Sequence, residues 1–486
     1  MVMLGLFFLV CAGYYAIPVW DSDFWWHIAS GHVILQHGLP SVDPFGVFPT
    51  VDSVRNDTVL KGQWLGQVIL YALYAAGGFN AVVAFRVLVL LTGLWLILWR
   101  CRRLAVGWWP TALLLVLAAL SVGKFGGERP QLLSFLLGAL FFLVIDRAEH
   151  NSRWLLALPL ITVLWANSHG GVILGVALLG LWVLLKLLSG SSKRDKRNWL
   201  LALAAVALAS LATPNGLQTY LYLFNLEGSV LQSRTSEYAS VFQLYAMGQW
   251  WPQVWAVLFY LVAVTGCVGL YWQRAWRPLA VTVFLALISA TSIRYFIFFL
   301  LLTSPYIASG LHALAQKQFP RMVSAQRVPA AANGLLILAM VVMLSWGAWR
   351  GRLFQGGFYA AAYPVAIADF MQHSLPATAP KAKPPRVFNN LKWGGYLLWK
   401  LTPKVQLYID GRMLDAARFS PYTNMLWATP QGIQWFRRQD FQWVILPHHG
   451  HYDPQPYGLI NYLQRQPDWR QVYSDAKGVV FRRLHE

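Results

Sequence analysis

The chain has 486 residues, of which 57% are hydrophobic and only 12% are charged, and its formal net charge is +20. Soluble domains usually carry about 25% charged residues, so this composition excludes an ordinary soluble protein and indicates a polytopic membrane protein. The positive charge does not indicate nucleic-acid binding. The basic residues form short clusters between apolar runs of membrane-spanning length, which is the pattern of cytoplasmic loops.

A helix that crosses a bilayer needs roughly 20 mostly apolar residues. We predict eleven such spans, at 2–19, 81–99, 105–122, 131–146, 153–167, 171–188, 198–213, 251–271, 278–292, 295–313 and 331–349. The first span lacks the basic start and the small-residue cleavage site of a signal peptide, so we expect it to be retained. We predict that the apolar run 64–79 is an interfacial or re-entrant helix.

Five basic groups separate these spans, at 100–103, 146–153, 191–197, 273–277 and 316–327. With 81–99 as the second span, all five groups lie on one side, which the positive-inside rule assigns to the cytoplasm. The N-terminus is then cytoplasmic, whereas 20–80, 214–250 and everything after about residue 350 are extracytoplasmic. Eight of the eleven acidic residues before residue 351 are also on that outer side. We therefore expect any chemistry to take place there.

The region after residue 350 is more polar and has strand-like runs such as "VQLYID" among helical stretches. We predict two domains: a transmembrane domain over 1–350, with interfacial helices in its first outer loop (20–80), and a periplasmic α/β or α+β domain over 351–486. Within the second domain, Gly394–Gly395 and Asp410–Gly411 are predicted turns. Asp410 and Arg412 are expected to form a structural ion pair, the alternative being that they reach the membrane site.

The first outer loop begins with a pair of carboxylates, Asp21 and Asp23. Two carboxylates can bind a divalent cation such as Mg²⁺ or Mn²⁺ together with a diphosphate, or one can act as general base on an acceptor hydroxyl. We favour Asp23 as the base and Asp21 as a helix cap or second metal ligand. His27, about one turn later, is the third candidate catalytic residue. Trp25 and Trp26 are typical of an aromatic belt at a membrane surface.

Polar and cationic side chains at the outer ends of other spans are suited to a lipid-linked phosphate, because arginine meets phosphate oxygens bidentately and histidine can shuttle a proton. The candidates are Lys124, Glu128, Arg129, Gln131, Asn167, His169, Arg234, Glu237, Arg294 and Tyr295. For each the alternative is structural: an anchoring charge, an ion pair or a partner for turn carbonyls. Arg86, inside a span, is either functional or paired with an acid in the bundle.

These motifs resemble the GT-C superfamily of integral-membrane glycosyltransferases, which includes protein O-mannosyltransferases, aminoarabinose transferases acting on lipid A, and oligosaccharyltransferases. The resemblance covers nearly the whole chain and is carried by "DSDFWWHIASGHVILQHGLPSVDPF", "QWLGQVILYALYAAGG", "ERPQLLSFLL", "LWANSHGG", "VFNNLKWGGYLLW" and "YIDGR". In that superfamily an acidic D/E-x-D/E motif follows the first span, and Asp21 and Asp23 occupy this place.

The resemblance implies inverting transfer of a sugar from a polyprenyl-phosphate donor to a glycan, lipid or protein acceptor at the outer face of the bacterial inner membrane. One aspartate would deprotonate the acceptor, and cationic groups or a divalent metal would neutralise the leaving phosphate. A second class stays open, a non-catalytic polyprenyl-lipid binding, flipping or envelope-assembly factor on the same scaffold. A solute transporter is disfavoured, because the sequence has no repeated halves.

Overall fold

The chain separates into two compact units. The computed structural model describes residues 2–46, 58–221, 238–246, 250–318, 328–351, 355–375, 383–412, 416–450 and 455–484. A helical unit comprises Met1–Val19 and Ala76–Gly357, and a mixed α/β unit comprises Trp20–Ala75 and Phe358–Glu486. The sequence analysis assigned the first outer loop to the helical domain, whereas the structure groups most of that loop with the C-terminal region.

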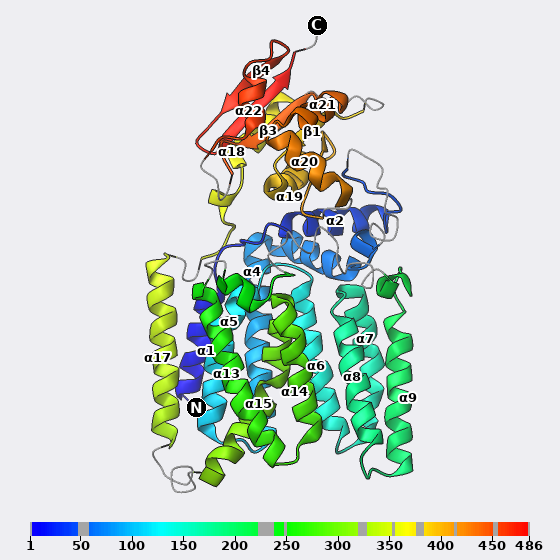
Figure 1. The fold of residues 1–486 in the computed structure, drawn as a ribbon, viewed down its shortest axis with the longest axis vertical. Coiled ribbons are helices and arrows are strands. Elements are labelled where there is room, and N and C mark those ends of the chain that lie inside the picture. Colours follow the sequence, from blue (N-terminus) through cyan, green and yellow to red (C-terminus); the bar gives the residue numbers. More distant parts are fainter. Residues whose placement is uncertain are drawn as a thin grey trace. The chain divides into compact units, whose positions relative to one another are not determined.

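The helical unit is a bundle whose main helices run side by side (Figure 1). Its elements are α1 (Val2–Tyr15), the second part of α4 (Trp64–Arg103), α5 (Trp108–Phe125), α6 (Gln131–Ala148), η1 (Ser152–Leu156), α7 (Ala157–Ser168), α8 (Val172–Leu187), α9 (Lys193–Ser210), α12 (Val241–Ala246), α13 (Trp250–Trp272), α14 (Trp276–Thr291), η3 (Ile293–Tyr295), α15 (Phe296–Gln318) and α17 (Val328–Trp349). Each of the eleven predicted spans overlaps one of these helices.

Five helices in the described part of the chain are long and apolar enough to cross a membrane, and they include α4, α6 and most of α13, α15 and α17. Four further apolar helices are shorter, among them α1, α8 and α14. The protein is therefore a multi-pass membrane protein, as its composition predicted. That all eleven spans cross the bilayer stays a prediction.

Helix α4 contains a break that separates its two parts. At Gly77 and Gly78 the backbone leaves helical geometry, and Gly78 has φ 61°, a left-handed value that favours glycine. The break lies close to the boundary between the two units. Residues 64–75 thus belong to the mixed unit, and the part that overlaps the predicted span 81–99 belongs to the helical unit.

Helix α15 forms the core of the helical unit. Its side chains are buried almost continuously from Phe296 to Leu311. Helix α13 approaches it closely, because a Cβ atom on Gly310 would lie only 2.0 Å from the carbonyl oxygen of Gly266. Small residues at such a crossing let two helices pack at backbone distance, which is how helices associate where no water drives them together.

Ion pairs connect residues of four predicted basic groups at one end of the helical bundle. The pairs are Arg100–Asp146 (2.6 Å), Arg277–Glu149 (2.6 Å), Lys186–Glu149 (3.0 Å) and Lys186–Asp195 (2.9 Å). They link four of the five basic groups, and they use all three acidic residues that the charge pattern assigned to that side. The prediction that these groups share one side is consistent with this clustering, whereas its assignment to the cytoplasm stays a prediction.

The mixed unit is built around a five-stranded sheet of order β2-β1-β3-β5-β4. Its strands are β1 (Arg386–Asn389), β2 (Gln406–Leu407), β3 (Trp443–Pro447), β4 (Trp469–Ser474) and β5 (Gly478–Arg483). β1 pairs in parallel with β2 and β3, whereas β5 is antiparallel to β3 and β4. Parallel neighbours need a crossover, and α19 (Leu391–Leu401) provides it between β1 and β2. The prediction of a small C-terminal domain with strands and helices is confirmed.

Helices complete the mixed unit. They are α2 (Phe24–His37), the first part of α4, the 3₁₀ turns η4 (Ala360–Ala362) and η5 (Ala416–Arg418), α18 (Val365–Ser374), α20 (Phe419–Leu426), α21 (Pro430–Arg438) and α22 (Gly458–Leu463). An apolar core formed by α20, α21, α22 and the sheet includes Phe388, Met425, Phe436 and Phe481. This core fixes the sheet on which the C-terminal motifs lie.

The first loop enters this unit through close packing of α2 on α19. A Cβ on Gly395 would lie 3.0 Å from the carbonyl oxygen of Ser22. Gly394 and Gly395 lie within α19, so the prediction of a turn there is wrong. Because glycine has no Cβ, these two positions let neighbouring backbone pack closely against the helix. Trp25 is 1% exposed and packs edge-on against Tyr363 and Tyr396. The aromatic-belt interpretation is thus wrong for Trp25, which belongs to the core of the mixed unit.

Candidate functional site

The two carboxylates of the first loop lie at the start of α2 and have different environments. The backbone N–H of Asp23 donates a hydrogen bond to Oδ1 of Asp21 at 2.9 Å, and Asp21 is only 3% exposed. Asp21 thus fixes the turn that precedes the helix, whereas the N-cap position belongs to Asp23. Asp23 occupies the N-cap position and is half-buried, but its carboxylate makes no capping hydrogen bond.

His27 lies one turn further along α2. Its backbone N–H donates to the carbonyl oxygen of Asp23 at 3.2 Å, and its ring lies 3.5 Å from that of Trp26, centroid to centroid, at an angle of 34°. The side chain is only 2% exposed. The three predicted catalytic residues therefore lie at or just before the start of one helix, with Asp23 the most accessible of them.

The structure brings the C-terminal "YIDGR" motif against this turn. A Cβ atom on Gly411 would lie 2.6 Å from Oδ1 of Asp23 and 3.3 Å from Nε1 of Trp26. The backbone of Gly411 consequently forms one wall of the Asp23 environment. Contact between the two motifs was predicted only as the alternative to a structural ion pair of Asp410 and Arg412.

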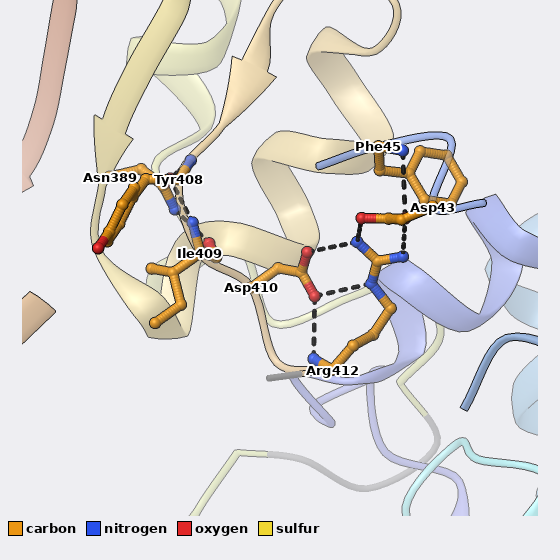
Figure 2. Close-up of polar contacts among 7 residues, drawn as sticks. All are labelled: Asp43, Phe45, Asn389, Tyr408, Ile409, Asp410 and Arg412. Atoms are coloured by element: carbon orange, nitrogen blue, oxygen red, sulfur yellow. Dashed lines mark hydrogen bonds and ion pairs between the residues drawn. The ribbon is translucent and has the colours of Figure 1, made fainter. Parts of the chain in front are cut away.

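Arg412 holds this second motif in a buried ionic network (Figure 2). Its Nε and Nη2 atoms donate to the carboxylate oxygens of Asp410 at 2.8 and 2.6 Å. Its Nη1 and Nη2 atoms donate to Asp43 at 2.5 and 3.2 Å. The predicted Asp410–Arg412 ion pair is confirmed, and Asp43 is a further member of the network that the sequence analysis did not assign.

Electrostatics in this network favour the charged forms. Burial by itself would raise the pKa of Asp410, but the guanidinium of Arg412 outweighs burial and lowers the pKa of that carboxyl below its ordinary value. Burial would likewise lower the pKa of Arg412, and the two carboxylates raise it instead. Asp410 and Arg412 are therefore ionised at neutral pH.

Few of the protein side chains that the structure describes around Asp21 and Asp23 could coordinate a metal ion. In the described ranges no group of three or more His, Cys, Asp or Glu side chains is arranged to hold a metal ion. Oδ1 of Asp21 already accepts the amide of Asp23. The two carboxylates therefore fit a cation such as Mg²⁺ only if phosphate oxygens and water complete its coordination, a composition that Mg²⁺ commonly adopts.

A second polar group lies in the helical unit, at the turn between α7 and α8. Nε1 of Trp165 donates to Oγ of Ser134 at 2.7 Å, and this hydroxyl lies 2.8 Å from Nδ1 of His169. The backbone N–H of Gly171 donates to the same Nδ1 at 3.0 Å. Because Nδ1 accepts these bonds, the proton of the neutral imidazole is assigned to Nε2.

Two predicted phosphate-binding arginines act on His169. Burial lowers the pKa of its imidazole to about 3, and the positive charges of Arg294 and then Arg129 contribute further. Arg294 also lies over the ring of Tyr238, with 4.1 Å between its guanidinium carbon and the ring centroid. The arrangement combines a neutral imidazole that offers an Nε2–H donor with two cationic side chains, as an anion site requires. We call Arg129, His169 and Arg294 the cationic cluster.

The low pKa leads to a first testable expectation. In the ligand-free protein the His169 imidazole should stay neutral between pH 5 and pH 8, and a bound phosphate dianion should raise its pKa by opposing the arginine charges. NMR of ring-labelled histidine, with and without geranylgeranyl phosphate, measures both. An imidazole that titrates between pH 6 and pH 7 without ligand would contradict the assignment.

Glu128 and Arg86 form an ion pair inside the bundle. Arg86 is 2% exposed and Glu128 is 0% exposed, and Arg86 also donates to the carbonyl oxygens of Tyr15, at 2.8 Å, and Ile17. The expectation that Arg86 pairs with an acid in the bundle is confirmed. Its partner Glu128 thereby has a structural role, whatever further role it has in phosphate binding.

The other candidates are dispersed. The Asn167 side-chain amide donates to the carbonyl oxygens of Val163 and Ala212 at 2.9 and 2.8 Å, which ties α7 to the segment after α9. Gln131 begins α6, and Tyr295, in η3, is 37% exposed. Arg234, Glu237 and the side chain of Lys124 lie outside the described residues.

Comparison with known proteins gives no match to a family model or to a curated protein. Solved structures do match, and this chain shares their fold.

The solved structures that match include several of the oligosaccharyltransferase AglB of Archaeoglobus fulgidus. Its apo form matches with a TM-score of 0.62 and 10% sequence identity, covering 92% of this chain and 69% of that one. Its complex with an inhibitory peptide and a dolichol-phosphate matches with a TM-score of 0.53 and 11% sequence identity, covering 92% of this chain and 69% of that one. Its complex with Zn and sulfate matches with a TM-score of 0.57 and 10% sequence identity, covering 92% of this chain and 68% of that one.

Proposed function

We propose that this protein is an inverting glycosyltransferase that moves a sugar from a polyprenyl-phosphate donor to a glycan, lipid or protein acceptor. The reaction takes place at the outer face of the bacterial inner membrane, with the N-terminus in the cytoplasm and the mixed unit outside. Support for the reaction class comes from the GT-C fold and from the position of Asp21 and Asp23 directly after the first helix.

The observation that carries the donor assignment is the cationic cluster. Arg294 and Arg129 are near enough to the His169 imidazole to lower its pKa, and His169 lies at a turn of the bundle, on the opposite end of α6 from the Arg100–Asp146 pair. Cations are costly near a bilayer and are retained there for function or pairing. A lipid-linked phosphate supplies the matching anion at this depth.

The chemistry assigned to each group follows from its atoms. The Asp23 carboxylate takes the proton from the acceptor hydroxyl, whose oxygen then bonds to the anomeric carbon of the sugar. The bond between that carbon and the phosphate oxygen breaks with inversion. In the helical unit, the cationic cluster is suited to bind a lipid-linked phosphate. A Mg²⁺ or Mn²⁺ ion held by Asp21 and Asp23 would stabilise the negative charge that develops on the leaving phosphate.

Removing one arginine of the cationic cluster should weaken donor binding. We expect Arg294→Gln, and separately Arg129→Gln, to raise the Kd for geranylgeranyl phosphate by about 10-fold or more, because a hydrogen bond to a charged group contributes about 1.5–3 kcal/mol. Arg274→Gln is the matched control, since Arg274 is exposed and lies in the 273–277 basic group at the other end of the bundle. Equal affinity in all three variants would remove the donor assignment.

A further inference from the structure

The Asp23 carboxylate lies beside a backbone that leaves no room for a side chain. A Cβ on Gly411 would stand 2.6 Å from its Oδ1, well inside van der Waals distance. One residue before Asp23, the carbonyl oxygen of Ser22 would lie 3.0 Å from a Cβ on Gly395. Two glycine backbones from the C-terminal region therefore lie against the start of α2.

The Gly411 backbone is itself held in place from both directions. Upstream, Asn389 is fully buried and its amide donates to the carbonyl oxygen of Ile409 at 2.7 Å, while its Oδ1 accepts the backbone N–H of Tyr408 at 3.1 Å (Figure 2). Downstream, the backbone N–H of Arg412 donates to Oδ1 of Asp410 at 2.9 Å. The turn thus has little freedom to move away from Asp23.

Arg412 connects this turn to the first loop. Its guanidinium binds Asp410 on one side and Asp43 on the other, and Arg412 is only 4% exposed. Its guanidinium carbon also lies 5.0 Å from the centroid of the Phe45 ring. Beyond Phe45, Gly46 pairs with Leu407 of β2, so the segment that carries Asp43 is added to the edge of the sheet. One side chain therefore links three parts of the mixed unit.

We propose that the Asp410–Gly411–Arg412 turn positions the Asp23 carboxylate and that Arg412 is the positioning residue that holds the turn. This inference rests on the proposed function, in which Asp23 is the general base. A base must stand within hydrogen-bond reach of the proton it removes, and a misplacement of about 1 Å can cost about 100-fold in rate. The turn supplies a fixed wall that restricts the carboxylate.

Gly411→Ala tests the proposal without altering a charge. The added methyl group displaces the Asp23 carboxylate, so kcat for the release of polyprenyl phosphate from a labelled polyprenyl-phosphate hexose should fall by about 10-fold or more. The Kd for geranylgeranyl phosphate should not change. The pH dependence of kcat should also shift, because the carboxylate moves relative to its neighbours, and a merely structural role would leave that profile unchanged in the folded fraction.

Gly458→Ala is the matched control in the same unit. Its Cβ would meet the carbonyl oxygen of Trp427 at 2.4 Å, so it should lower the Tm of the mixed unit with no change in kcat per folded molecule. Arg412→Lys keeps the charge but loses the bidentate fork, and it should reduce kcat to an intermediate degree.

Wild-type kcat in Gly411→Ala, or a loss no larger than that of Gly458→Ala, overturns the positioning proposal. Failure of the proposed function is a different result, since it requires that Asp23→Asn also retain wild-type turnover.

Discussion

Asp23→Asn is expected to lower sugar transfer by about 10²–10⁴-fold, the usual contribution of a positioned general base. The amide is nearly isosteric with the carboxylate, so the contact with Gly411 and the start of α2 should persist. Only the ability to accept a proton is lost. Transfer is measured as release of polyprenyl phosphate from a labelled donor, with native membrane extract as the source of acceptor.

Asp21→Asn provides the internal comparison for this result. Its side-chain oxygen can still accept the Asp23 amide, so the turn should form as before. If Asp21 serves only as the cap, transfer should stay within a few-fold of wild type, and a larger loss that added Mn²⁺ relieves would identify Asp21 as a metal ligand. Wild-type transfer by Asp23→Asn would show that this carboxylate is not the base.

The second large effect is on stability. Arg412→Met is expected to lower the free energy of unfolding of the mixed unit by about 3–5 kcal/mol, because removing the cation leaves the Asp410 and Asp43 carboxylates buried without their charge partner. Thermal unfolding in detergent, followed by hydrogen exchange within residues 386–412, measures the change. Arg483→Met is the control, since its pair with Asp440 is exposed and should contribute no more than about 1 kcal/mol.

The pH dependence of this effect follows from the lowered pKa of Asp410. A carboxyl whose folded pKa is below its ordinary value of 3.8 contributes stability above that value and loses it as the pH falls through the folded pKa. In Arg412→Met the buried carboxyls instead become easier to protonate, so acid relieves their cost. The difference in free energy of unfolding between the wild-type protein and Arg412→Met should therefore become smaller as the pH falls towards 4. A difference that is independent of pH, or equal destabilisation by Arg483→Met, would contradict the network's role.

The arrangement of the helices could be predicted from the sequence because it depends on local quantities. Apolar length determined where each helix lies, and the placement of charge predicted that groups such as 100–103 and 273–277 lie at the same end. The same reasoning gave pairing of Arg86 with an acid as one of two alternatives, since a lone buried cation is costly. These features need no knowledge of which distant residues meet.

The association of the first loop with the C-terminal region could not be predicted in this way. Asp43 and Arg412 are separated by 369 positions, and neither the hydropathy nor the spacing of either segment indicates the other. Trp25 has the composition of a membrane-surface residue, yet tertiary packing against Tyr363 and Tyr396 buries it. Gly394 and Gly395 have the composition of a turn, yet they lie in α19, where Gly394 packs against Ile409 and Asp410 and Gly395 packs against Ser22.

The candidate site was anticipated in part. Sequence reasoning selected Asp23 and the three members of the cationic cluster as chemically suitable residues. It missed Ser134 and Trp165, whose hydrogen bonds determine which nitrogen of His169 carries the proton. The available signal was a hydroxyl in the first turn of an apolar helix, three residues after the end of "ERPQ". Without the fold, that signal does not indicate which histidine it serves.

Donor turnover by the purified wild-type protein tests the central claim most directly. The protein would be reconstituted in nanodiscs with a panel of labelled polyprenyl-phosphate sugars and native membrane extract. We predict time-dependent release of polyprenyl phosphate from at least one donor and appearance of the label in an acceptor, with inverted anomeric configuration. Tight binding of geranylgeranyl phosphate with no turnover of any donor would contradict the enzyme and indicate a lipid-binding or flipping factor instead.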